Sequence, residues 1–286
     1  MLNELANGWF SEISPMWEGV ALSIEIEEHL FSKKTKYQQV DMFKTKTCGN
    51  MLVLDGIIQA TEMDEFAYQE MLTHIPMCAH PNPEKVLVIG GGDGGILREI
   101  AKHDCVKEID ICEIDEVVIN VSKEYLPSMA CGFDDPRVNL FLGDGSIFIK
   151  DKQQNYDVII VDSSDPIGPG EALFQSPFYE GMKTALKPDG IIATQGESFF
   201  LHQETVKNLL TVCKNLFNNA KYAYMLVPTY PGGNIGICAA SDTLDPQTPL
   251  RKLPEKIQNS LQYYNEEIHK TSFILPQLGK KLLESK

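Results

Sequence analysis

The sequence is poor in the features that mark membrane, secreted and metal-binding proteins. No stretch approaches the ~20 apolar residues of a membrane span. The first residues, MLNELANGWFSE, contain neither the basic segment nor the apolar run of a secretion signal. The seven cysteines form no CxxC pair and show no zinc spacing. We therefore expect a cytoplasmic protein with reduced thiols, no bound metal and no membrane partner.

Positive charge is also scarce. The chain has 25 Lys and Arg against 40 Asp and Glu, a formal net charge of -15. Nucleic-acid binding needs clustered Lys and Arg, so this composition argues against a nucleic-acid partner and suits a cationic substrate better. At 286 residues the chain is long enough for ~2 domains.

The first sixty residues are predicted to be β-rich. Residues 21–31 and 39–47 have strand patterns, Gly49-Asn50 is a hairpin signal, and residues 51–61 continue as a β-stretch. From Thr61 to Met77 apolar residues recur at helical spacing, with Thr61 as the expected cap. We therefore expect an N-terminal β-domain over residues 1–62 and a catalytic domain over residues 63–286.

Beyond residue 81 strand and helix patterns alternate. The expected strands are 85–90, 108–115, 138–144, 156–162 and 190–196, and helical segments separate them. This alternation predicts an α/β fold, with a parallel sheet covered by helices on both faces. The last part of the chain is predicted to form an antiparallel hairpin around PGGN, followed by an amphipathic segment.

A glycine turn follows the first of these strands. Gly90, Gly92 and Gly95 satisfy G-x-G-x-x-G between a strand and a helix, a pattern typical of dinucleotide-binding proteins. However, Asp93 lies inside the turn, where the pyrophosphate of a dinucleotide would meet the helix N-terminus, and two anions repel each other. The turn therefore favours a cationic nucleoside, such as S-adenosylmethionine or a relative, over NAD.

Acidic residues also end the next three strands. Glu113 is placed to accept hydrogen bonds from ribose hydroxyls, Asp144 can meet an adenine amino group or another ribose, and Asp162 and Asp165 follow a buried strand. Each acid could instead cap the helix that follows it. Their succession at the ligand-binding edge of one sheet favours a cationic ligand.

These residues belong to longer motifs that resemble those of a known family. The motifs are GWFSE (8–12), KYQQV (36–40), LVLDGIIQATEMDEFAYQEM (52–71), GGGDGGILRE (90–99), CEID (112–115), GDG (143–145), VDSSDPIGP (161–169), QGES (195–198) and VPTYPGG (227–233). The chain resembles the aminopropyltransferase (polyamine synthase) family, and its eukaryotic spermidine-forming members most closely.

The resemblance implies a homodimer whose N-terminal β-domain precedes a Rossmann-like domain of methyltransferase type. It also implies transfer of the aminopropyl group of decarboxylated S-adenosylmethionine, a co-substrate, to putrescine. The products are spermidine and 5'-methylthioadenosine, and no permanently bound cofactor is expected. The implied contacts to the nucleoside substrate are Gln38, Leu54, Gln59, Asp93, Glu113, Ile114, Asp144, Gly145, Asp162 and Ser163. The implied contacts to putrescine are Trp17, Tyr68, Gln69, Asp93, Asp162, Asp165, Glu197 and Tyr230.

Asp162 is the candidate acceptor of the proton from the attacking amine, and Tyr68 is expected to orient that amine. A carboxylate with an ordinary pKa near ~4 is a poor base for an amine near ~10. Burial of Asp162 would raise its pKa, and the sulfonium of the co-substrate would lower the pKa of the amine. The loop after Asp162 is expected to order over the bound substrates, and Gly170 in it replaces an alanine that the resemblance leads us to expect.

Three alternatives stay open at this point. A putrescine N-methyltransferase shares nearly all these motifs, but it accepts the carboxylate of S-adenosylmethionine and has an apolar residue in place of Asp93. A spermine synthase would differ in the length of its amine pocket. A non-catalytic, polyamine-binding homologue should have lost Tyr68, Asp162 or Asp165, and all three are present.

Overall fold

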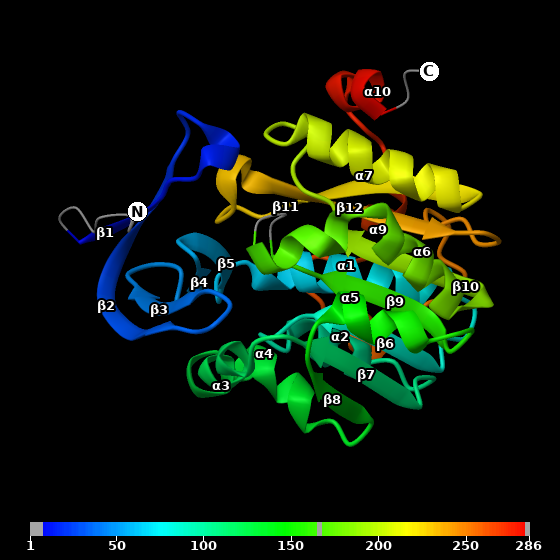
Figure 1. Ribbon diagram of the computed structural model, residues 1–286, viewed down its shortest axis with the longest axis horizontal. Coiled ribbons are helices and arrows are strands. Elements are labelled where there is room, and N and C mark those ends of the chain that lie inside the picture. Colours follow the sequence, from blue (N-terminus) through cyan, green and yellow to red (C-terminus); the bar gives the residue numbers. More distant parts are fainter. Residues whose placement is uncertain (1–7, 165–167, 284–286) are drawn as a thin grey trace.

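The computed structural model describes residues 8–164 and 168–283, which form two β-sheets and the helices around them (Figure 1). The first sheet is antiparallel, with its strands in chain order. Its strands are β1 (Trp9–Glu12), β2 (Leu22–Lys34), β3 (Gln39–Thr45), β4 (Asn50–Leu54) and β5 (Ile57–Thr61). β3 and β4 pair in antiparallel fashion around the turn at Gly49, which has φ 71°, so the predicted hairpin is confirmed.

The predicted β-stretch 51–61 is in fact two strands. Asp55 and Gly56 connect them, and both have positive φ, 48° and 83°. A two-residue turn with positive φ at both positions is the connection whose twist matches that of antiparallel strands. The Asp-Gly pair therefore turns the chain back on itself at this point.

The second sheet has seven strands in the order β11-β12-β10-β9-β6-β7-β8. They are β6 (Lys85–Gly90), β7 (Glu108–Glu113), β8 (Val138–Leu142), β9 (Tyr156–Asp162), β10 (Leu186–Gln195), β11 (Asn219–Leu226) and β12 (Asn234–Ser241). β6 to β10 are parallel, and β12 is antiparallel to both β10 and β11. The predicted parallel sheet and C-terminal hairpin are confirmed.

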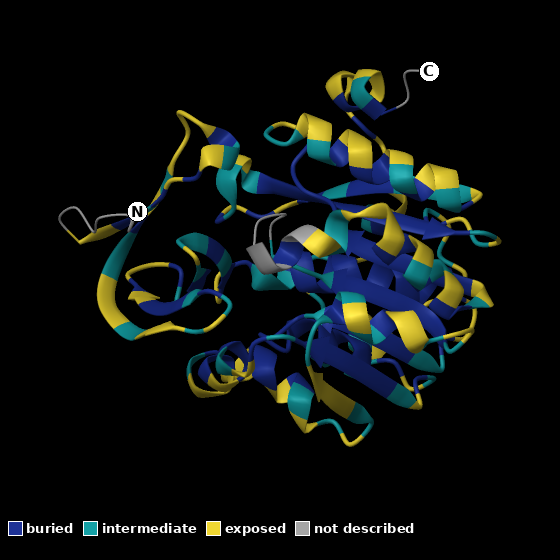
Figure 2. Cartoon of the chain, in the orientation of Figure 1, coloured by how far each residue is buried: buried dark blue, intermediate teal, exposed yellow. Residues whose placement is uncertain are grey.

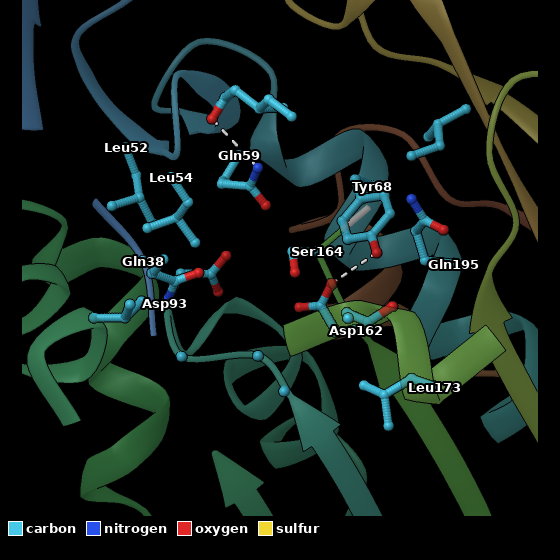
Figure 3. Close-up of a pocket in the computed structure, with 18 of the residues that line it drawn as sticks. Gln38, Leu52, Leu54, Gln59, Tyr68, Asp93, Asp162, Ser164, Leu173 and Gln195 are labelled. Atoms are coloured by element: carbon cyan, nitrogen blue, oxygen red, sulfur yellow. Dashed lines mark hydrogen bonds between the residues drawn. The ribbon is translucent and has the colours of Figure 1, made fainter. Parts of the chain in front are cut away.

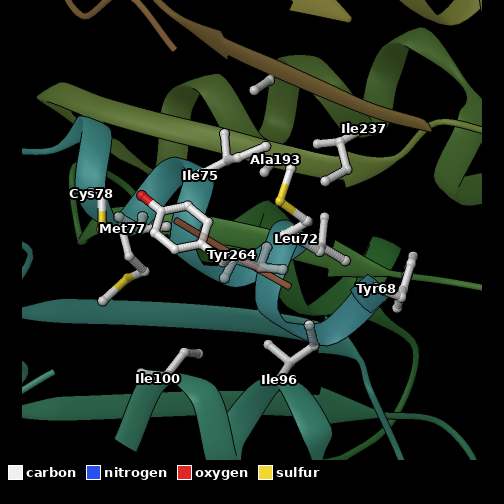
Figure 4. Close-up of a cluster of buried hydrophobic side chains, with 14 of the residues drawn as sticks. Tyr68, Leu72, Ile75, Met77, Cys78, Ile96, Ile100, Ala193, Ile237 and Tyr264 are labelled. Atoms are coloured by element: carbon white, nitrogen blue, oxygen red, sulfur yellow. The ribbon is translucent and has the colours of Figure 1, made fainter. Parts of the chain in front are cut away.

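Helices cover both faces of this sheet because its central strands are apolar on both sides. Val86, Val88 and Ile160 face one cluster, in which α1 (Glu65–Ala79), α2 (Gly95–Ala101) and Tyr264 pack (Figure 4). The alternate residues Leu87 and Ile159 face α6 (Ser176–Ala185), α7 (Gln203–Leu216) and α10 (Gln277–Leu283). Figure 2 shows these strands buried beneath helices whose outer faces are exposed.

The helix predicted from Thr61 begins later, at Glu65. Thr61 is the last residue of β5, and Asp64 occupies the N-cap position without making a side-chain cap bond. Asp64 instead accepts hydrogen bonds from Thr61 Oγ1 (2.9 Å), and from Thr229 N and Oγ1 (both 2.8 Å). The carboxylate thus ties the start of α1 to the loop between β11 and β12.

The two sheets are joined through α3 (Glu116–Tyr125) and α4 (Pro127–Ala130). Val118, Val121 and Met129 pack against Val40 and Leu52 of the N-terminal sheet. Asn50 Nδ2 also donates to Tyr125 O at 2.8 Å. The N-terminal sheet is thereby held over the ends of the parallel strands (Figure 1). The other helices are α5 (Gly145–Phe148), α8 (Glu255–Gln258) and α9 (Glu266–Thr271).

The cysteines and the helices bear on two expectations, reduced thiols and the lack of a membrane span. All seven cysteines lie within the described residues and none forms a disulfide; five are buried. Within residues 8–164 and 168–283, no helix combines the length and the apolar character that a bilayer crossing requires.

Candidate active site

A cavity lies where the N-terminal sheet meets the carboxyl ends of the parallel strands (Figure 3). β1, η1 (Pro15–Trp17), the residue before β3, β4 and β5 supply one wall, and the segments after β6, β7, β8, β9 and β10 supply much of the other. Most of the residues predicted from the sequence line it: Trp17, Gln38, Leu54, Gln59, Tyr68, Asp93, Glu113, Ile114, Asp144, Gly145, Asp162, Ser163, Glu197 and Tyr230.

The glycine turn and the end of β9 are in direct contact. Gly90 has φ 78°, and a Cβ on it would lie 2.0 Å from the carbonyl oxygen of Asp162. Gly91 N donates to the same oxygen at 3.2 Å. Only glycine allows this approach, so the turn is fixed against the residue that carries the candidate base.

Asp93 is buried at the tip of the turn. Its Oδ1 accepts from Gly95 N at 2.7 Å and its Oδ2 from Gln69 Nε2 at 2.9 Å. Burial raises the pKa of Asp93, and the hydrogen bonds and the charge of Arg98 oppose that rise. Gln69 is buried and is not among the residues that line the cavity, and its contact with putrescine stays a prediction. Its Nε2 holds the Asp93 carboxylate, and its Oε1 is buried without a hydrogen-bond partner.

Asp162 and Tyr68 form a pair at the centre of the cavity (Figure 3). Tyr68 Oη donates to Asp162 Oδ1 at 2.7 Å. Burial raises the pKa of Asp162 to about 8, and the negative charge of Asp93 adds to the rise. Burial likewise raises the pKa of Tyr68 well above its ordinary value, so the phenol keeps its proton. Asp162 is therefore a far stronger base than an exposed aspartate.

Glu113 and Asp144 lie on the opposite side of the glycine turn. Burial raises the pKa of Glu113 to about 7, and its Oε1 accepts from Asp115 N at 2.8 Å. Asp144 Oδ1 accepts from Ser146 N at 2.7 Å and so caps α5. Asp144 also lines the cavity, which means that capping and a place in the site are compatible.

Gln38 belongs to the same region. Its Nε2 donates to Asp115 Oδ2 at 3.3 Å, which links β3's start to the N-cap of α3. In Figure 3, Gln38 and Leu54 lie near Asp93, whereas Gln195 lies beyond Tyr68. The cavity therefore has one end at Asp93, Gln38 and Leu54 and another beyond the Tyr68–Asp162 pair.

Glu197 marks the end beyond Tyr68. It has φ 57°, a conformation that is costly for a residue other than glycine and that clusters at functional sites. Its carbonyl accepts from Tyr222 Oη at 2.6 Å and Gly236 N at 2.8 Å, which hold the strained backbone in place. Gln195 Nε2 donates to Glu197 Oε1 at 3.1 Å. Tyr230 Oη donates to Gln59 O at 2.6 Å, connecting this end with β5.

Two wall residues, Glu12 and His202, were missed in the sequence. Glu12 is fully buried, its Oε2 accepts from Ile58 N at 2.8 Å, and burial raises its pKa to about 8. It alternates with Phe10 on the buried face of β1, and an acid at an apolar position of a strand was the available signal. His202 gave no such signal, because it precedes α7 in a loop.

The loop after β9 contributes Ser163, Ser164, Gly170 and Leu173 to the wall. Asp165, predicted to hold putrescine, lies outside the described residues. Among the described residues, no group of three or more His, Cys, Asp and Glu is arranged to hold a metal ion.

The charge of the cavity defines what it can bind. Six carboxylates line it: Glu12, Asp93, Glu113, Asp144, Asp162 and Glu197. No Lys or Arg is found among the described lining residues. Glu12, Asp93, Glu113 and Glu197 are buried, and Asp144 and Asp162 are half-buried. Carboxylates removed from water are costly unless a cation meets them, so the ligands that this cavity accommodates best are cations. Together with the strand order and the glycine turn, this defines a Rossmann-like protein whose site suits cationic ligands.

The comparisons with known proteins identify the family. Residues 65–251 match the spermine/spermidine synthase domain, and residues 8–62 match the spermidine synthase tetramerisation domain. The chain belongs to the spermine/spermidine synthase family.

The similarity to known proteins extends over nearly the whole of this chain and of each relative. The chain is 52% identical to spermidine synthase from Dictyostelium discoideum over 99% of both chains. It is 50% identical to spermidine synthase from Schizosaccharomyces pombe, over 98% of this chain and 95% of the relative. A spermidine synthase structure in complex with the transition-state analogue AdoDATO has a TM-score of 0.92 and 38% identity, over 99% and 97% of the two chains. The spermidine synthase from Thermotoga maritima has a TM-score of 0.90 and 38% identity, over 96% and 94%.

Proposed function

We propose that this chain transfers the aminopropyl group of decarboxylated S-adenosylmethionine to putrescine, giving spermidine and 5'-methylthioadenosine. The observation that carries this proposal is the buried carboxylate of Asp93 within the glycine turn, in a cavity wall without Lys or Arg among the described residues. The donor has an amine and a sulfonium but no carboxylate, so Asp93 attracts it. The carboxylate of ordinary S-adenosylmethionine would face Asp93 and be repelled.

The nucleoside of the donor is assigned to the end of the cavity near Gln38 and Leu54. Glu113 accepts hydrogen bonds from the ribose hydroxyls, and Asp144 with Gly145 meets the adenine. Gln38, Gln59, Ile114 and Ser163 complete this end. The support for these roles is their position on the wall and the family resemblance.

Asp162 is assigned the role of proton acceptor. The neutral nitrogen of putrescine attacks the methylene carbon next to the sulfonium, a new C–N bond forms, and the C–S bond breaks with its electron pair left on sulfur. The proton lost from nitrogen passes to Asp162. The raised pKa of Asp162 supports this role because it narrows the gap to the amine. Tyr68, which donates to Oδ1, leaves Oδ2 of Asp162 to receive the amine.

The second amine of putrescine is assigned to the end that holds Trp17, Glu197 and Tyr230. These side chains lie beyond the Tyr68–Asp162 pair, as an extended diamine requires. Asp165 keeps its predicted role here as a hypothesis. Gln69 also keeps its predicted contact with putrescine as a hypothesis, and its Nε2 holds Asp93 in position.

The test is release of 5'-methylthioadenosine from decarboxylated S-adenosylmethionine with putrescine, spermidine, cadaverine or agmatine as acceptor. We expect turnover with putrescine. Absence of turnover with every amine would leave the non-catalytic alternative. A methylated product from S-adenosylmethionine would identify a putrescine N-methyltransferase, and a strong preference for spermidine would identify a spermine synthase.

We also propose that the chain forms a homodimer and is cytoplasmic. We further propose that it consists of an N-terminal domain over residues 1–62 and a catalytic domain over residues 63–286. Exposed Trp9, Ile13 and Val20 in the N-terminal part support self-association. The N-terminal family match carries the description tetramerisation domain, so light scattering must distinguish a dimer from a tetramer. The unpaired thiols are compatible with a reducing compartment.

A further inference from the structure

Several buried polar atoms on the cavity wall lack a hydrogen-bond partner, and those of Gln195 and His202 lie beside Glu197. Glu12 Oε1, Trp17 Nε1, Gln195 Oε1 and both ring nitrogens of His202 are buried without a well-aligned hydrogen bond. All four residues line the cavity. A buried polar atom without a partner costs ~1–3 kcal/mol, so this end of the cavity is arranged for a polar ligand group.

His202 is the member of this group whose side chain has no role so far. It is only 7% exposed, and its Nδ1 lies 2.8 Å from Glu197 Oε2. Its ring packs against that of Trp17, with the centroids 5.5 Å apart. A carboxylate beside Nδ1 favours the proton on that nitrogen, which leaves Nε2 with a free lone pair. In the tautomer with the proton on Nδ1, His202 therefore offers the cavity an acceptor at Nε2.

We propose that Nε2 of His202 accepts a hydrogen bond from the non-reacting ammonium group of the diamine. This inference rests on the proposed function and adds a binding residue to it. A primary ammonium has three donors, and two buried acceptors without a partner, Gln195 Oε1 and His202 Nε2, belong to residues that contact Glu197. Glu197 supplies the countercharge beside them. Trp17 Nε1 is a donor and cannot serve this group.

The arrangement has a consequence for selectivity. Both acceptors need an N–H donor from the ligand, because a buried acceptor left unmatched is unfavourable. A diamine whose far end is a primary ammonium satisfies them. A trimethylated far end carries the same charge without any donor, so His202 makes the site selective for the N–H groups as well as for the charge.

Two substitutions of His202 separate its two nitrogens. The amide of His202→Asn reaches the position of Nδ1, so the contact with Glu197 is kept and the acceptor at Nε2 is lost. The longer amide of His202→Gln reaches the position of Nε2. We expect His202→Asn to raise the KM for putrescine by about tenfold or more, the effect of a hydrogen bond to a charged group. Its kcat should stay within about twofold. His202→Gln should keep the KM for putrescine within about threefold.

n-Butylamine provides the matched probe, because it has the reacting amine and no second ammonium. As a competitive inhibitor against putrescine, it should have the same inhibition constant for His202→Asn and the unaltered protein. An unchanged KM for putrescine in His202→Asn, or an equal loss for n-butylamine and putrescine, would overturn the proposal in favour of a packing role. Failure of the unaltered protein to use putrescine would instead refute the proposed function.

A second measurement needs no variant and remains available if His202→Asn fails to fold. The unaltered protein is compared with putrescine and with (4-aminobutyl)trimethylammonium as acceptors. We expect the KM of the trimethylated compound to be at least about tenfold higher. Equal KM values would show that the far end is recognised by charge alone and would overturn the role of Nε2.

Discussion

Replacing Tyr68 with Phe should move the pH dependence of catalysis in a direction that the site geometry fixes. Tyr68 Oη donates to the Asp162 carboxylate at 2.7 Å, and this bond lowers the Asp162 pKa against the upward effect of burial. Phe keeps the ring and removes only the donor. A hydrogen bond to a charged group is worth ~1.5–3 kcal/mol, and one pKa unit corresponds to about 1.4 kcal/mol. The Asp162 pKa should therefore rise further, by roughly one to two units.

The sign of the effect follows from the ionised form that the reaction needs. Asp162 accepts a proton only as a carboxylate, so a higher pKa requires a higher pH for the same activity. We expect the acid limb of kcat/KM for putrescine, measured by 5'-methylthioadenosine release, to move upward by roughly one unit or more. Free putrescine titrates in the same way in both assays. A difference in the pH of the acid limb between the two proteins therefore reflects a group of the enzyme.

Tyr179→Phe is the matched control for this measurement. Tyr179 is also fully buried, but its Oη lies 3.4 Å from Thr194 Oγ1 and it does not line the cavity. The acid limb of kcat/KM for Tyr179→Phe should lie at the same pH as that of the unaltered protein. An acid limb that stays in place for Tyr68→Phe, or that moves to lower pH, would refute the assignment of Asp162 as the base supported by Tyr68.

Three further substitutions test other parts of the site. Asp162→Asn should lower kcat by at least ~10²-fold and yet raise the melting temperature without ligands at pH 7.5. Burial raises the folded-state pKa of Asp162, so its contribution to stability is lost as the pH rises through that value, and Asn avoids this loss. Stabilisation by ~1 kcal/mol would raise Tm by roughly 2–4 °C; a lower Tm would show that Asp162 is not a stability cost. Asp93→Asn should weaken binding of decarboxylated S-adenosylmethionine by at least about tenfold, the size of a lost hydrogen-bonded charge contact. The variant should also show a smaller preference for this ligand over S-adenosylmethionine. Both affinities can be measured by calorimetry, and an unchanged preference would contradict the role of Asp93. Gly90→Ala should abolish most activity, because its Cβ would meet the Asp162 carbonyl oxygen at 2.0 Å at a φ of 78°; near-normal kcat would contradict a fixed contact between the turn and β9.

The sequence was sufficient for the parallel sheet because its signals are local. Val158 to Val161 is an uninterrupted apolar strand, and the glycines at 90, 92 and 95 mark a turn that only small residues permit. The break at Asp55-Gly56 was equally local, but the surrounding apolar residues were interpreted as one β-stretch. α1 begins later than predicted because Asp64 accepts a hydrogen bond from Thr229. This residue is 165 positions away in the sequence, and no local pattern reveals such a partner.

In the candidate site, too, features with local sequence signals could be predicted and features set by distant contacts could not. Acids at the ends of strands could be predicted because parallel strands bring their carboxyl ends to one edge. The separation of Gln69 from the cavity could not, since it depends on how α1 faces the glycine turn. His202 was missed for a similar reason: its position beside Glu197 and Trp17 is set by the loop after β10 and by the N-terminal segment together.

The uncompensated acids of the cavity also couple the lifetime of the folded chain to its substrates. Burial raises the pKa values of Glu12 and Glu113 to about 8 and about 7, as it does that of Asp162. The stability that these groups contribute is therefore lost as the pH rises through those values. Cationic ligands neutralise the carboxylates and bind only the folded chain, so they stabilise it by mass action. Thermal protection by putrescine and the sulfonium donor should accordingly be larger at pH 8 than at pH 6, and a cell depleted of both would hold a pool of this protein that proteases remove faster.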